Sequence, residues 1–148
     1  MLLLNLSCRV CIQVPTSLLN NTQDKLELKW LYHGTDASTV PKIVGRGFNR
    51  AFAGRNATVF GKGVDFAQHA SYSFKFADPD VNNVRRMFMC RVAVGDWCKG
   101  RRDQLTPDSK PGTHELFDST VNSITSPSVF VVYHDSQAYP EYLVTFTV

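Results

Sequence analysis

The chain has 148 residues, of which 43% are hydrophobic and 20% are charged, and its formal net charge is +3. This length and composition are typical of one ordinary globular domain and exclude a disordered or low-complexity chain. The basic residues lie in short groups and not in one long stripe, so the composition does not indicate a nucleic-acid partner.

The N-terminal segment, residues 1–28, fits no pattern found in the rest of the chain. Cys8 and Cys11 have the spacing of a zinc or redox pair, but no second pair follows, so we expect no metal. The apolar start lacks a basic region and is far shorter than a membrane helix, so we expect no membrane partner. We predict an atypical or truncated segment at 1–28, a domain at 29–148, and an intracellular protein, cytoplasmic or nuclear.

The remaining chain combines predicted strands with two short helices. Helices are expected at residues 39–44, capped by Ser38, and at 66–76, on either side of a glycine-containing loop at 49–63. Runs of apolar, β-branched and aromatic residues predict strands at residues 28–33, 86–94, 128–134 and 141–148. This balance indicates an α+β domain with split antiparallel β-sheets and a few short helices.

Four motifs, each present once, follow one another along the chain. They are Leu31-Tyr32-His33-Gly34-Thr35, Phe60-Gly61-Lys62-Gly63-Val64-Asp65-Phe66-Ala67, Ala70-Ser71-Tyr72-Ser73 and Tyr139-Pro140-Glu141-Tyr142-Leu143-Val144. Together they resemble the catalytic domain of the poly(ADP-ribose) polymerase family, over about residues 30–148. Residues 47–50 and 53–57 resemble the mono-ADP-ribosyltransferase branch, of the macrodomain-associated type. The resemblance implies an ADP-ribosyltransferase fold that uses NAD as its substrate and needs no metal.

The resemblance also implies roles for individual residues. His33 would hydrogen-bond a ribose hydroxyl, the backbone of Gly34 would hold the nicotinamide carboxamide, and Thr35 would place a hydroxyl near the ribose. Ser73 would bond the carboxamide oxygen, and Phe76 would stack on the nicotinamide ring, with Tyr72 and Phe74 as alternatives. Each of these residues alone also has an ordinary structural interpretation, and their shared register favours the functional one.

Two catalytic positions depart from the family pattern. Asp65 stands where the family usually has a tyrosine that packs against the nicotinamide, and a carboxylate there either faces the cationic ring or weakens NAD binding. Val129 stands where chain-building members have a glutamate, so we expect no polymer synthesis.

We therefore predict an NAD-dependent protein mono-ADP-ribosyltransferase that modifies protein side chains, its own included. Because of Asp65, an alternative is a catalytically inactive binding or scaffolding module with the same fold. An NAD glycohydrolase, which would transfer ADP-ribose to water, is a third and weaker interpretation.

Overall fold

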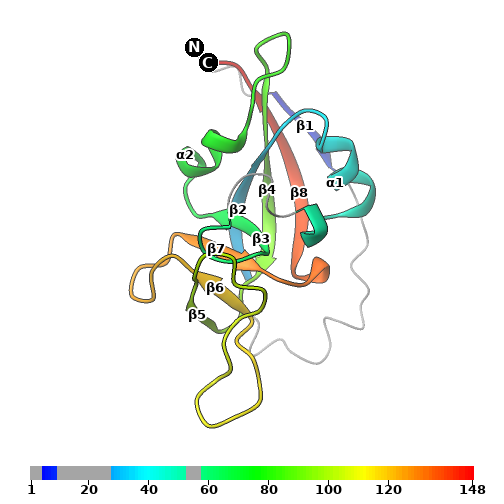
Figure 1. The fold of residues 1–148 in the computed structure, drawn as a ribbon. Helices are drawn as coiled ribbons and strands as arrows, with labels where there is room; N and C mark the ends of the chain where they lie inside the picture. Colours follow the sequence, from blue (N-terminus) through cyan, green and yellow to red (C-terminus); the bar gives the residue numbers. More distant parts are fainter. Residues whose placement is uncertain (1–4, 10–27, 53–57) are drawn as a thin grey trace.

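The computed structural model describes residues 5–9, 28–52 and 58–148 and is built around a sheet (Figure 1). In this described part the sheet has eight strands in the order β1-β8-β4-β2-β3-β7-β6-β5. The strands are β1 (Asn5–Arg9), β2 (Leu28–Thr35), β3 (Val64–Ala67), β4 (Arg85–Ala93), β5 (Trp97–Lys99), β6 (Ser119–Val121), β7 (Val129–Val132) and β8 (Ala138–Phe146). Neighbouring strands are antiparallel except β5 and β6, which are parallel.

The sheet consists of two halves that meet at β2 and β3. In the first half, β2 pairs with β4 over the full length of β2, from Leu28 to Thr35. Between the halves, β2 and β3 pair at one position, Tyr32 opposite Ala67. Continuing that antiparallel register would place Gly34 opposite Asp65, but the strands separate before that point. The split predicted from the sequence is thus a divergence of two neighbouring strands.

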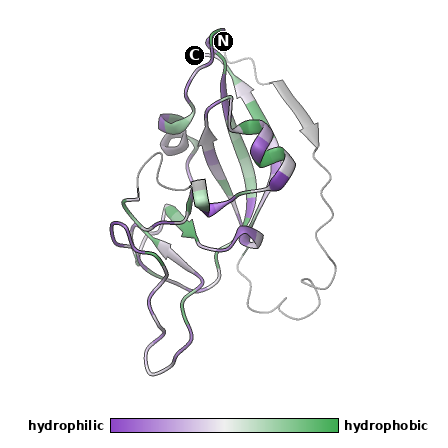
Figure 2. Cartoon of the chain, turned by 45° about the vertical axis from the view of Figure 1, so that its right-hand side comes forward, coloured by the Kyte–Doolittle hydropathy of each residue, from purple (hydrophilic) through white to green (hydrophobic). Residues whose placement is uncertain are grey.

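Helix α1 (Val40–Arg46) covers the core side of the sheet. Its apolar residues Val40, Ile43 and Val44 follow the i, i+3, i+4 spacing of one helix face and pack against the core, and hydrophobic and hydrophilic residues alternate around it (Figure 2). The expected cap at Ser38 is wrong. The carboxylate of Asp36 instead accepts hydrogen bonds from the backbone N–H groups of Ser38 and Thr39.

The core lies between α1 and both halves of the sheet. Its largest side chains are aromatic: Phe48, after α1, packs edge-on against Phe66 of β3 with ring centroids 4.9 Å apart, and against Phe88 of β4 at 6.1 Å. Since these rings come from separate elements, the core holds α1, β3 and β4 together.

The helix predicted at residues 66–76 is wrong at its start. Phe66 and Ala67 belong to β3, and the helical part is a short α2 (Ala70–Ser73) followed by the 3-10 turn η3 (Phe74–Phe76). The Val-Asp-Phe-Ala run is too short for its period of two to stand out against the helical spacing that follows it. The short strands β5 and β6 were also missed. Two further 3-10 turns are η2 (Arg50–Phe52) and η4 (Asp135–Gln137).

Strand β1 lies at the edge of the sheet and pairs antiparallel with β8, Asn5 opposite Thr145. Part of the N-terminal segment therefore contributes backbone pairing to the sheet, whereas Cys11 lies outside the described residues. The domain boundary at residue 28 stays a prediction. No helix in the described ranges is long and apolar enough to cross a membrane.

Candidate active site

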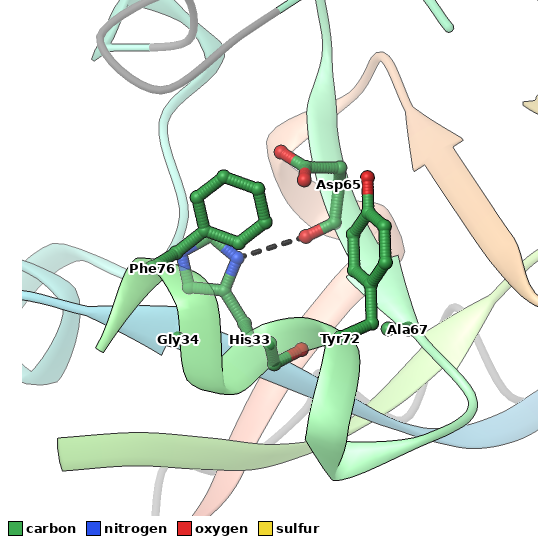
Figure 3. A pocket seen from close by; sticks show the side chains of 7 residues that line it. His33, Gly34, Asp65, Ala67, Tyr72 and Phe76 are labelled. Carbon is green, nitrogen blue, oxygen red and sulfur yellow. Dashed lines mark hydrogen bonds between the residues drawn. The ribbon is translucent and has the colours of Figure 1, made fainter. Parts of the chain in front are cut away.

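A pocket opens where β2 and β3 diverge, and α2 and η3 cover one side of it (Figure 3). Seven residues line it: His33, Gly34, Asp65, Ala67, Tyr72, Ser73 and Phe76. Five of these were predicted as site residues from the sequence, and Tyr72 was an alternative for the stacking aromatic.

His33 bridges the gap between the two strands. Its Nδ1 lies 2.8 Å from the backbone oxygen of Asp65. Because a carbonyl oxygen only accepts, Nδ1 must carry the proton, and in the neutral ring Nε2 is then the acceptor. The ring also packs against Phe48 and Phe66, with centroid distances of 5.1 and 5.4 Å. The strand, the carbonyl and two core rings therefore hold the imidazole in one orientation.

Gly34 and Ser73 form the contact between β2 and α2. The Ser73 hydroxyl donates to the backbone oxygen of Tyr32 at 2.9 Å, and Ser73 is buried. A Cβ placed on Gly34 would lie 1.9 Å from the backbone oxygen of Ser73. Glycine is thus required here for the helix to pack on the strand, besides any approach of a ligand to its backbone.

The three aromatic candidates for stacking separate into two groups. Tyr72 and Phe76 both line the pocket, with ring centroids 5.6 Å apart and planes inclined by 54°. Figure 3 shows them on either side of the Asp65 carboxyl group. Phe74 instead packs against Phe146 of β8, at 6.0 Å, and under the guanidinium of Arg85, at 4.6 Å. Phe74 is therefore not part of the pocket.

Asp65 presents its carboxyl group to the pocket without an ion pair. Within the described part of the chain, no cationic side chain lies within salt-bridge distance of it. Burial raises the pKa of the Asp65 carboxyl group, and the nearby His33 ring and the backbone N–H of Asp65 oppose this rise only in part. Burial, and then the charge of Asp65, also raise the pKa of Tyr72. Keeping the Asp65 carboxyl group ionised in this position therefore costs free energy.

Thr35 and Val129 are not among the residues that line this pocket. Thr35 is buried at the end of β2, opposite Arg86. Val129 is 2% exposed on β7 and lies directly opposite Ala67 of β3, so its side chain is on the same face of the sheet as Ala67, one strand farther from β2. Ala67 was missed as a lining residue, because the sequence placed it in a helix. Residues 53–57, whose sequence resembles the mono-ADP-ribosyltransferase branch, lie outside the described residues.

A model of the poly(ADP-ribose) polymerase catalytic domain family matches residues 13–114. The chain belongs to this family. Similar relatives are protein mono-ADP-ribosyltransferase PARP14 of Homo sapiens, 42% identical over 122 residues, and PARP10 of Mus musculus, 37% identical over 131 residues. The alignments cover 80% and 86% of this chain but only 7% and 14% of those relatives. The chain therefore spans a small part of the length of the curated relatives it matches.

The fold agrees with a solved member of the same family. The PARP domain of Arabidopsis RADICAL-INDUCED CELL DEATH1 superposes with a TM-score of 0.73 at 18% identity. The alignment covers 98% of this chain and 88% of that one. The predicted α+β ADP-ribosyltransferase fold is thereby confirmed.

Proposed function

We propose that this PARP-family domain is an NAD-dependent protein mono-ADP-ribosyltransferase. Family membership supports the use of NAD, and several relatives that match the chain carry mono-ADP-ribosyltransferase names. The observation that carries the proposal is the convergence of His33, Gly34 and Ser73 on one pocket beside two aromatic rings. Ser73 follows His33 by 40 positions in the chain, and the folded sheet and α2 bring the two together.

In the proposed complex, the nicotinamide ring enters the pocket and stacks on Phe76 or Tyr72. Backbone groups at Gly34 hold the carboxamide. His33 accepts a hydrogen bond from a ribose hydroxyl at Nε2, because Nδ1 already donates to the backbone oxygen of Asp65. The Ser73 hydroxyl donates to Tyr32, so it must rotate to donate to the carboxamide instead. These residues position NAD; Thr35 would act from the adjacent end of β2.

The proposed reaction replaces the nicotinamide by a protein side chain. The bond between the ribose carbon C1′ and the ring nitrogen breaks, and its electron pair stays on the nitrogen, so nicotinamide leaves neutral. The ribose carries positive charge until the acceptor side chain supplies an electron pair and releases its proton to solvent. Positioning supplies most of the catalysis for such a good leaving group. Val129 offers no carboxylate to activate a bound ADP-ribose, which supports transfer of single units.

The test is the intact mass of the purified chain after incubation with NAD and a mixture of acceptor proteins. Mass increases by separate ADP-ribose units on the chain or on an acceptor are expected, without long ladders at one site. Unchanged masses, with NAD consumed to free ADP-ribose, would instead indicate a glycohydrolase. Unchanged masses with NAD intact would favour a non-catalytic module.

A further inference from the structure

Asp65 contributes the one carboxylate among the described residues that line the pocket. It lines the cavity beside two aromatic rings, and no cation of the described residues pairs with it. By contrast, Asp80, Asp96, Asp108 and Glu141 each form an ion pair with a lysine or arginine. A partly buried carboxylate without a partner is unfavourable unless a ligand supplies the opposite charge.

The groups around Asp65 favour a flat organic cation as that ligand. The faces of Tyr72 and Phe76 attract positive charge as well as apolar surface. The titratable side chains that face the carboxylate are His33 from β2 and Tyr72 from α2, and on β7 its paired residue is the uncharged Val131. His33 directs its Nδ1–H to the backbone oxygen of Asp65 and not to its carboxylate.

We propose that Asp65 is a specificity-determining residue that makes the pocket select a positively charged pyridinium ring over the neutral ring of the same shape. This inference rests on the proposed function and deepens it. The nicotinamide ring of NAD is cationic, whereas the released nicotinamide is neutral. The pocket therefore holds the substrate ring more tightly than the product ring, and nicotinamide is a weak product inhibitor.

Cleavage moves the positive charge away from the ring and onto the ribose. After the electron pair passes to the ring nitrogen, Asp65 no longer faces a cation in the ring position. Attraction between the carboxylate and the ring is thus lost when the product forms, which favours release of nicotinamide. Without such an ion pair, the carboxamide contacts would not distinguish the two rings, and the aromatic faces alone would give only a small preference for the cationic one.

The experiment compares two small probes, 1-methylnicotinamide, which carries a permanent ring charge, and neutral nicotinamide. Ligand-observed NMR titrations at pH 7.5, up to millimolar concentrations, give the dissociation constants for the full chain. We expect 1-methylnicotinamide to bind about tenfold more tightly, as an ion pair in a partly buried site allows. In Asp65→Asn, which keeps the side-chain shape, the ratio should fall by about threefold or more, to the small preference that the aromatic faces alone provide.

Glu115→Gln is the matched control, because it removes one carboxylate from an exposed loop outside the pocket. It changes the net charge by the same amount and should keep the wild-type ratio. A wild-type ratio of one or less, an unchanged ratio in Asp65→Asn, or no saturable binding of either probe overturns the inference. If the chain transfers ADP-ribose from NAD but binds the two probes equally, the inference about Asp65 is overturned and the proposed function stands. If it prefers the charged probe but transfers no ADP-ribose, only the proposed function is overturned.

Discussion

His33 reaches across the divergence of β2 and β3 and donates from Nδ1 to the backbone oxygen of Asp65, at 2.8 Å. Where the two strands no longer pair, this side chain replaces a backbone hydrogen bond of the ladder. The contact fixes the histidine tautomer whatever side chain stands at position 65, because it uses only the backbone of that residue. A different side chain at position 65 should therefore leave this hydrogen bond in place and change only the pocket wall.

His33→Ala should abolish most of the activity that we propose. Loss of the group that positions the ribose should lower the transfer rate about 100-fold, comparable to removal of one preorganised hydrogen-bonding group. The loss of ring packing against Phe48 and Phe66 should also destabilise the domain by about 1–3 kcal/mol. The intact-mass assay, run well below the melting temperature, measures the first effect, and His114→Ala in an exposed loop is the control. Wild-type transfer by the His33 variant would contradict the site.

Gly34→Ala should destabilise the protein, whereas Gly45→Ala should not. The new Cβ at position 34 would lie 1.9 Å from the backbone oxygen of Ser73, so α2 must move off β2 at a cost of about 2–3 kcal/mol. No atom lies within 4 Å of the corresponding position at Gly45 in α1, where alanine should add about 0.5–1 kcal/mol through its helix propensity. Urea unfolding curves of the two variants test this contrast, and equal midpoints would refute it.

Asp65→Asn should stabilise the domain at neutral pH and have little effect in acid. The pKa of Asp65 is raised above its ordinary value of 3.8, so the folded state holds this proton more tightly than the unfolded state does. In the wild type, the contribution of Asp65 to the free energy of unfolding is therefore fully present below pH 3.8. It declines as the pH rises through the folded-state pKa. At pH 7.5 we expect Asp65→Asn to gain about 0.5–2 kcal/mol. Urea unfolding between pH 3.5 and 7.5 would reveal this dependence.

Asp80→Asn is the control of opposite sign. The backbone N–H of Val84, followed by Arg86, lowers the pKa of Asp80, so its contribution is present at neutral pH and is lost as the pH falls through the folded-state pKa. The substitution should therefore weaken the protein slightly at pH 7.5 and not at low pH. If both variants showed the same pH trend, the assignment of Asp65 as a desolvated carboxylate would be wrong.

Val129→Glu should not convert the protein into a polymer-forming enzyme. Val129 is 2% exposed and lies beside Ala67 on the neighbouring strand, so a glutamate there would be an unpaired buried charge costing about 3 kcal/mol or more. Val129→Ile keeps the apolar character and should cost less than about 1.5 kcal/mol. Denaturant unfolding compares the two variants, and the mass assay follows the products. A stable Val129→Glu protein that builds ladders at single sites would disprove this expectation.

The sequence by itself determined the family, the fold class and most of the pocket. The motifs around His33, Asp65 and Ser73 follow a recognisable order. The long strands β2, β4 and β8 have strong apolar patterns that can be detected from the sequence of each segment alone. The short strands were harder, because three or four residues do not establish a period. Strand β3 was therefore partly assigned to a helix, and Ala67 was missed as a pocket residue.

Only the tertiary structure decided the relationships between distant segments. Three features depend on how the elements pack against one another. They are the separation of β2 from β3 after Tyr32, the hydrogen bond from His33 to the backbone oxygen of Asp65, and the position of Phe74 outside the pocket. The pairing of β1 with β8 near the opposite end of the chain also depends on this packing. Local periodicity specifies which face of a strand or helix is apolar. Strand register and the gap between two strands arise from long-range pairing, which no local pattern encodes.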